Sequence, residues 1–305
     1  MTQLAIEQQD LYRAYSQSYQ TEASNRRISF IADIVFAAIA AAIAAAIASG
    51  DSSSSIVDFL ITWLPTAALV WLIFRESGLF VEDKEHRRIA VAIQEQFDLT
   101  FWKSKAWSEG WNHLLCGDPI QPRKIRDLSQ KNKELDFDDD YWIATHDIPP
   151  NEAALLRIQQ SAGWGAMGHE RYARLNKSLA LICPALIIAT ALISDLDARE
   201  TAAVLMAMAP LVVGRLHSAR AHAALALKRE DLERHIRNLL SSTSLATERD
   251  VRTAQDELCR MRLENRRIPT WLYKKYAVRD RNAIDTAVAS DAATLRQRLQ
   301  QSDNK

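Results

Sequence analysis

The chain has 305 residues, and its 38 Lys and Arg balance 38 Asp and Glu, so the formal net charge is zero. A neutral chain argues against a protein whose overall field attracts a nucleic-acid polymer. The counts of 8 Gly and 8 Pro exclude a collagen-like or broadly disordered chain. The 3 Cys lie far apart without a CxxC pair, which argues against a disulfide framework and a cysteine zinc site.

Four apolar runs in two pairs dominate the sequence. They cover residues 28–49, 56–74, 178–194 and 201–214. A helix that spans a bilayer needs about 20 mostly apolar residues, with about 17 as the lower bound. The first three runs meet that length, and the fourth meets it only with flanking residues. The pattern predicts an all-α membrane protein with two transmembrane helical hairpins and a mainly helical cytosolic domain. The alternative for the first run is an Ala-rich soluble helix buried in a bundle.

Basic residues cluster at the outer ends of both pairs. These are Arg26, Arg27, Arg75, Lys84, Arg87, Arg88, Arg171, Arg174, Lys177, Arg215, Arg220, Lys228 and Arg229. The short connections inside the pairs contain one basic residue, Arg199. By the positive-inside rule, both termini and the central segment face the cytoplasm. Because the polar N-terminal segment does not read as a signal peptide, we expect the spans themselves to place this multi-pass protein in the membrane.

These boundaries divide the chain into five parts. They are a cytosolic N-terminal helix at 1–27, a transmembrane hairpin at 28–75, a cytosolic domain at 76–177, a second hairpin at 178–216, and a cytosolic helical tail at 217–305. The apolar spacing of residues 1–25 predicts an amphipathic helix that packs on the cytosolic domain or lies on lipid. Asn151, after two prolines, is the expected N-cap of the helix that enters the third run.

The tryptophans of the central segment are Trp102, Trp107, Trp111, Trp142 and Trp164. We expect them to fill a small core, and a base-stacking platform is the alternative. A leucine stripe predicts a helix from 217 to 262, with a solvated face or a subunit contact. Pro269 then breaks the helix, and residues 266–276 suit either a headgroup boundary or packing on the domain. A last polar helix is expected at 282–301.

The sequence shows no P-loop, HExxH or GxSxG motif. His217 and His222 have the wrong spacing for one helix face of a metal site. The acidic run Asp136–Asp140 lacks the glycine and distal glutamate of a calcium loop. His113 and Cys116 have no orienting partner. We therefore predict no catalytic residue, no metal and no resident cofactor, and thus a protein that is not an enzyme.

Ionisable residues and prolines in the apolar runs are the candidates for pore lining or gating. Asp33 and Arg215 lie in or at the ends of spans, where such residues usually face a bundle interior or a water path. Arg215 can instead extend to the headgroups. Pro65, Pro184 and Pro210 interrupt three of the runs and permit kinks, although proline is also common in static spans.

Short motifs along the chain match one known group. They are Gln8-Gln9-Asp10-Leu11-Tyr12, Ile93-Gln94-Glu95-Gln96-Phe97-Asp98, Trp111-Asn112, Arg171-Tyr172 and Ile268-Pro269-Thr270-Trp271-Leu272-Tyr273. With these motifs the chain resembles the SMODS-associated four-transmembrane effectors, pore-forming proteins of bacterial cyclic-oligonucleotide anti-phage systems. It departs from them in the longer aromatic stretch from Phe101 to Trp111.

The resemblance implies a membrane-disrupting effector that stays inactive until a cyclic oligonucleotide arrives from a partner nucleotidyltransferase. An aqueous pore also needs more polar lining than one chain offers, so a homo-oligomer in the lipid bilayer is expected. Two other functions share parts of this pattern. One is a membrane adaptor or sensor that forms no pore, and the other is a soluble helical-bundle interaction protein.

Overall fold

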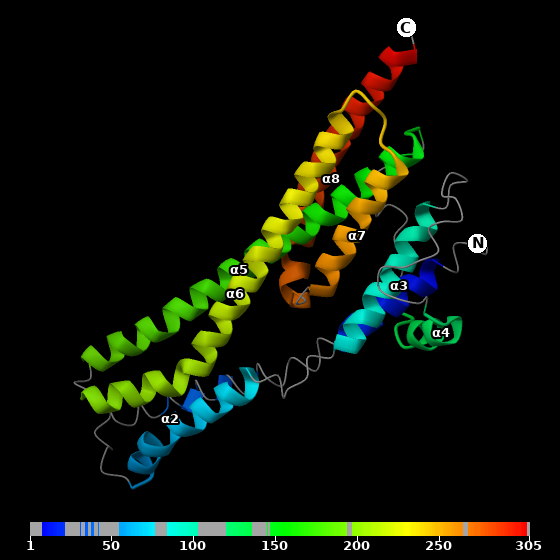
Figure 1. Cartoon of the computed structure of the whole chain (residues 1–305). Coiled ribbons are helices and arrows are strands. Elements are labelled where there is room, and N and C mark those ends of the chain that lie inside the picture. The colour runs from blue at the N-terminus through cyan, green and yellow to red at the C-terminus, as the bar shows by residue number, and fades with distance from the viewer. Residues whose placement is uncertain are drawn as a thin grey trace. The chain divides into compact units, whose positions relative to one another are not determined.

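A computed structural model describes residues 8–21, 31, 34, 35, 38, 39, 42, 55–76, 84–102, 120–135, 145, 147–193, 197–264 and 268–303 (Figure 1). Its helices are α2 (Ser55–Glu76), α3 (Lys84–Trp102), α4 (Pro122–Gln130), α5 (Pro150–Ile193), α6 (Ala198–Ser241), α7 (Glu248–Glu264) and α8 (Thr270–Asp303). Residues 8–21 are also helical. Within these described ranges there is no strand, so the prediction of an all-α chain is confirmed for them.

The chain divides into two compact units. Unit 1 contains Met1–Glu22, Lys84–Glu170 and His222–Lys305, and unit 2 contains Ala23–Asp83 and Arg171–Ala221. Helices α5 and α6 each contribute residues to both units.

The core of unit 1 lies where the first half of α5, the second half of α6, and helices α7 and α8 pack together. Its fully buried side chains include Leu155, Ile236, Leu258 and Leu295, one from each helix. Burying a side chain of this size contributes about 1.5–3 kcal/mol. The leucine stripe predicted in the tail belongs to this core, so it packs inside its own chain.

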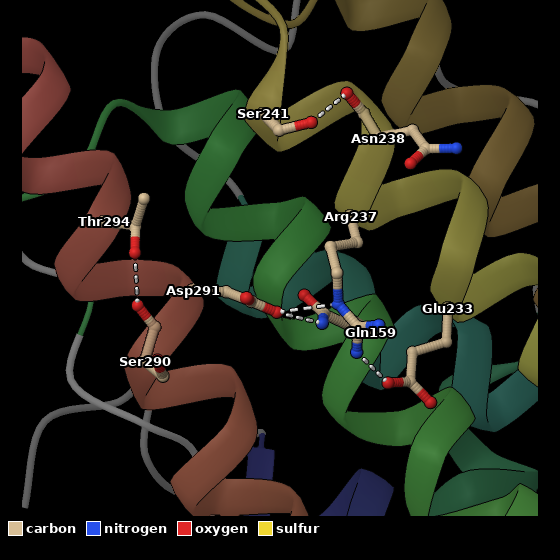
Figure 2. Close-up of polar contacts among 8 residues, drawn as sticks. All are labelled: Gln159, Glu233, Arg237, Asn238, Ser241, Ser290, Asp291 and Thr294. Carbon is tan, nitrogen blue, oxygen red and sulfur yellow. Dashed lines mark hydrogen bonds and ion pairs between the residues drawn. The ribbon is translucent and has the colours of Figure 1, made fainter.

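A shared carboxylate joins three of these helices at the surface of the core (Figure 2). Asp291 of α8 accepts hydrogen bonds from Gln159 of α5, at 2.6 Å, and from Arg237 of α6, at 3.3 Å. Arg237 also donates to Glu233, one turn earlier on α6, at 2.6 Å. These contacts align α8 with the α5–α6 pair over a short stretch of each helix.

The N-terminal helix belongs to unit 1 and packs against α3. Leu11 and Tyr15 are buried against Ile93 and Phe97 of α3. The rings of Tyr15 and Phe97 meet edge to face with centroids 5.6 Å apart, a favourable geometry for aromatic pairs. The prediction that this segment packs on its own domain is confirmed for residues 8–21.

Asn151 is not an N-cap, contrary to the prediction. Helix α5 already begins at Pro150, whose fixed φ suits the first helical position. The carbonyl of Pro149 accepts the first helical hydrogen bond, from Ala153 N at 2.9 Å. The side-chain amide of Asn151 instead donates to the carbonyl of Ala246 at 2.9 Å.

The predicted continuous helix over 217–262 is also wrong. Helix α6 ends at Ser241, and α7 begins at Glu248. Serine and threonine at 241–244 favour local hydrogen bonds over a helix interior. Thr247 and Asp250 then cap α7 reciprocally, with backbone-to-side-chain bonds of 3.3 and 2.8 Å. The last helix starts at Thr270, directly after Pro269, and not at 282.

Unit 2 contains α2, the second half of α5 and the first half of α6. Helices α5 and α6 are long and apolar enough to cross a membrane, and α2 carries a shorter apolar stretch, Thr62–Ile73. Most of the first predicted span lies outside the described residues. The fourth run gains its length from flanking residues, because α6 continues beyond both ends of 201–214. Of the four predicted spans, the structure thus identifies two as candidate membrane helices.

The connection between α5 and α6 ends in a capping box. The Asp197 carboxylate accepts from Glu200 N at 2.7 Å, and the Glu200 carboxylate accepts from Asp197 N at 3.0 Å. This pair satisfies amide groups that helix geometry leaves open, which explains why α6 starts within a few residues of the end of α5.

Candidate functional site

Unit 2 exposes many large apolar side chains and buries several small ones. The buried alanines include Ala68, Ala180, Ala191 and Ala207, beside a few large residues such as Ile187 and Val204. The exposed large side chains include Ile31, Ile34, Val35, Phe59, Trp63, Leu69, Val70, Ile73, Leu179, Leu181, Ile182, Leu186, Ile188, Leu192, Ile193, Met206 and Val213. Small residues between helices and large apolar residues outside are typical of helices that pack in lipid.

The burial of the two long helices supports the same interpretation. Only 22% of the most apolar stretch of α5 and 33% of that of α6 is buried. The core helix of a soluble protein would be mostly buried, because an exposed apolar surface of this extent is unfavourable in water. The arrangement therefore argues against the soluble-bundle alternative.

The three proline candidates lie on three different helices. Pro65 is half-buried in α2, Pro184 is half-buried in α5, and Pro210 is buried in α6. Each helix continues through its proline. Asp33 lies outside the described residues, so the structure does not place it relative to the prolines.

Arg215 makes a specific contact within unit 2. Its Nη1 donates to the side-chain carbonyl of Asn176 at 3.0 Å, which joins α6 to α5. Asn176 is fully buried, and its Nδ2 donates to the carbonyl of Tyr172 at 2.7 Å. Arg215 is half-buried in this arrangement rather than extended into solvent.

Unit 1 contains a buried polar cluster that the sequence analysis did not identify. Asp98 of α3 and Arg262 of α7 form an ion pair in which both side chains are about 95% buried. Gln255 donates to the same carboxylate oxygen at 3.3 Å, and Arg262 Nη2 donates to Ser161 Oγ of α5 at 3.2 Å. Burial lowers the pKa of Arg262, but Asp98, Tyr19 and Cys259 together more than offset that effect, so the pKa lies above its ordinary value.

A second arginine approaches the same serine from α6. Arg229 is 5% exposed, and its Nη1 donates to the carbonyl of Ser161 at 3.3 Å. Burial, with repulsion from Arg262 as the next cause, lowers the pKa of Arg229 to about 10. Arg229 stays charged at neutral pH, although its surroundings disfavour the charge.

Two histidines meet beside this arginine. His169 of α5 and His222 of α6 are buried, with their Nδ1 atoms 2.7 Å apart and their rings stacked at 4.9 Å. Burial, Arg229 and His222 all hold the pKa of His169 well below its ordinary value. Two neutral rings fit this distance, since one Nδ1–H can donate to the other Nδ1.

The predicted absence of a shared His217–His222 face agrees with the structure. His217 is exposed, whereas His222 is buried against His169. Over the described ranges, no group of three His, Cys, Asp or Glu side chains is placed to hold a metal ion. The acidic run 136–140, His113 and Cys116 lie outside those ranges.

Three glycines allow α5 to approach its neighbours in unit 1. A Cβ on Gly163 would lie 2.8 Å from Ile284 Cδ1, and one on Gly168 would lie 2.7 Å from Ile268 Cδ1. A Cβ on Gly165 would overlap the guanidinium of Arg229. These residues have the Gly-x-Gly-x-x-Gly spacing of dinucleotide-binding loops, which the sequence analysis missed. They lie inside a helix and follow no strand, so they do not form such a loop.

The sequence contains a signal that could have identified Arg229 as a buried charge. Arg229 follows Leu225 by four residues and precedes Leu232 by three, which places it on the apolar stripe of α6. A charge on a buried stripe needs a partner or a function. Of the five tryptophans of the central segment, Trp164 packs partly buried against the main core, and the side chains of the other four lie outside the described part of the chain.

The comparisons with known proteins agree with the architecture. The model of the SMODS-associating 4TM effector domain matches residues 1–290. No curated protein and no solved structure matches the chain. With nearly the whole length matched by one family, the chain belongs to the SMODS-associating 4TM effector domain family.

Proposed function

We propose that the chain is a membrane-disrupting, pore-forming effector of an anti-phage defence system that responds to a nucleotide second messenger. The observation that carries the proposal is the apolar outer surface of α5 and α6 in a chain of this effector family. Large side chains such as Leu186 and Ile193 are exposed where a soluble protein would bury them. Hydrocarbon is the environment in which this surface is stable.

In this proposal the two units have different roles. Unit 1 has an extensive core and a buried polar cluster, and it receives the signal. Unit 2 carries the apolar helices and acts on the bilayer. Because α5 and α6 contribute to both units, a change in how they pack in unit 1 is transmitted along the same helices. The signal must favour the open assembly by binding it more tightly than the closed one.

The open assembly is a homo-oligomer in the bacterial inner membrane, with both termini of each chain in the cytoplasm. Asp33 and Arg215 contribute polar lining, and Pro65, Pro184 and Pro210 permit the helix bending that opens the path. The contact between Arg215 and Asn176 is a feature of the closed form. No catalytic residue or resident cofactor takes part.

The test is leakage from vesicles. Purified full-length protein is reconstituted into dye-loaded liposomes, and products of the partner nucleotidyltransferase are added. We expect dye release only with protein and nucleotide together. Asp33→Asn and Arg215→Met are expected to reduce release with normal insertion, while Arg234→Met, on the exposed face of α6, serves as the control.

Protein that inserts, with or without nucleotide, but never releases dye would overturn pore formation. The same result, combined with nucleotide binding and no growth arrest in cells, would instead identify a membrane adaptor or sensor.

A further inference from the structure

Arg229 is a buried cation without an anionic partner. Among the described residues its hydrogen-bond partner is the carbonyl of Ser161, at 3.3 Å from Nη1, and its Nε has no partner there. No carboxylate within the described ranges lies at ion-pair distance from its guanidinium. Burying an arginine in this way is costly, because neither water nor a counter-ion compensates the charge.

The neighbouring arginine, Arg262, has the anionic partner that Arg229 lacks. Arg262 has the carboxylate of Asp98 and the hydroxyl of Ser161. The other buried carboxylate of α3, Glu95, accepts from the thiol of Cys259 at 3.6 Å. The two guanidiniums therefore meet at Ser161, and only that of Arg262 has an anion beside it.

The groups around Arg229 suit an oxyanion. A guanidinium offers a planar fork of donors that matches phosphate oxygens. Gly165 leaves the space against α5 in which this fork lies. The stacked pair of His169, one turn later on α5, and His222 of α6 lies close enough to the fork for Arg229 to lower the pKa of His169. These groups lie on α5 and α6, the helices that contribute residues to both units.

We propose that Arg229 anchors a phosphate-bearing anion that binds in unit 1 between α5 and α6. This inference rests on the proposed function, in which that anion is the activating signal. Because Arg229 is enclosed in the present form, the bound form requires α5 and α6 to separate at Gly165. The anion can compensate the Arg229 guanidinium only when α5 and α6 are separated. The anion therefore binds the separated form more tightly than the enclosed form, and this difference in affinity drives the separation.

Binding to full-length protein in detergent micelles tests the proposal. The probes are pyrophosphate, ATP, cyclic di-AMP, cyclic di-GMP and cyclic tri-AMP, each titrated by calorimetry. We expect at least one probe to bind saturably to the wild type and about 10–100-fold more weakly to Arg229→Met. Arg229→Lys, which keeps the charge but not the fork, is expected to lie between them.

Arg234→Met is the matched control, since Arg234 lies on the same helix, exposed and paired with Asp231 at 2.8 Å. It is expected to bind as the wild type does. Gly165→Ala is a second variant that displaces the guanidinium without removing it, and we expect it to weaken binding as well. Equal binding by wild type and Arg229→Met, or no saturable binding of any probe, would overturn the proposal.

The same variants separate this inference from the proposed function. Binding that depends on Arg229, without any dye release from vesicles, supports the anion site and contradicts the pore. Nucleotide-dependent dye release that is unchanged in Arg229→Met supports the pore and contradicts the anion site.

Discussion

Arg229 and Arg262 are buried within one cluster but have different partners. Arg262 has the carboxylate of Asp98, while Arg229 has the carbonyl of Ser161. The directions of their pKa shifts follow this difference, upward for Arg262 and downward for Arg229. The same residue type therefore stabilises unit 1 at one position and destabilises it at the other.

Replacing Arg229 with methionine should stabilise the resting protein. Met fills much of the same space and removes a charge that burial disfavours, a kind of change that contributes about 1–4 kcal/mol in other proteins. Thermal unfolding in a fixed detergent should show a rise of about 2–4 °C for each kcal/mol. A lower unfolding temperature than in Arg234→Met would contradict the view that Arg229 is uncompensated.

Removing Asp98 should have the opposite effect. Asp98→Ala leaves Arg262 buried without its carboxylate, which typically costs about 3–5 kcal/mol. Asp147→Ala is the matched control, because Asp147 pairs with Arg296 at 2.6 Å on the exposed surface. That surface pair should contribute no more than about 1 kcal/mol. Similar unfolding temperatures for the two variants would show that the buried pair contributes little.

The histidine pair predicts a loss of stability in acid. The pKa of His169 in the folded protein lies well below its ordinary value of 6.5, so below about pH 6.5 the unfolded chain binds more protons than the folded one. Folding stability should therefore fall as the pH drops from about 6.5 to 5. The double variant His169→Gln with His222→Gln should show a flatter profile in thermal unfolding at the same pH values. Parallel profiles would contradict the prediction.

At the scale of elements, the first half of α5 is the helix around which unit 1 packs. It buries Leu155 and Leu156 in the core, presents Ser161 to both arginines, and uses three glycines for close approach. Glycine inside a helix costs about 1 kcal/mol relative to alanine. In α5 that cost is offset by contacts that a Cβ would prevent.

A double-mutant cycle tests this role of Gly165. Gly165→Ala should destabilise the wild type, because the new Cβ overlaps the Arg229 guanidinium. In an Arg229→Ala background the same change should become neutral or stabilising, since alanine is the better helix former. A coupling above about 0.5 kcal/mol would support the contact. Gly168→Ala, which meets Ile268 instead, should show no coupling to Arg229.

Across the whole molecule, the two units differ in how many large apolar side chains they expose. Unit 1 buries an extensive cluster of leucine, isoleucine and alanine, whereas unit 2 buries a few large side chains and several alanines and exposes many of its large apolar side chains. A single chain that combines these two packing patterns suits a boundary between water and lipid.

The predicted topology follows from the basic residues at the outer ends of both pairs of apolar runs. Protease-sensitive tags at residues 1 and 305 should both be accessible from the cytoplasmic side, and a tag inserted at 195–200 only from the opposite side. The protein should stay in the membrane fraction after carbonate washing and leave it only with detergent. Tags of the two termini on opposite sides would contradict four spans.

The helical class, the apolar runs and the presence of an amphipathic N-terminal helix could all be predicted from the sequence. Periodicity and length suffice for these, because a helix must bury its apolar face whatever its partner is. The sequence also identified the family through short motifs distributed along the chain. The sequence-based prediction failed at Asn151, where the helix already begins at Pro150, and at residues 242–247, where Thr247 and Asp250 cap the start of α7.

The partners of the buried polar residues, in contrast, depend on how the helices pack in three dimensions. Asp98, Ser161 and Arg262 are far apart in sequence and unremarkable one by one, and their ion pair and hydrogen bonds exist because α3, α5 and α7 pack together. The missing counter-ion of Arg229 is likewise a property of its surroundings. A charge on a buried stripe can be seen in a sequence, but whether an anion compensates it depends on helices that fold beside it.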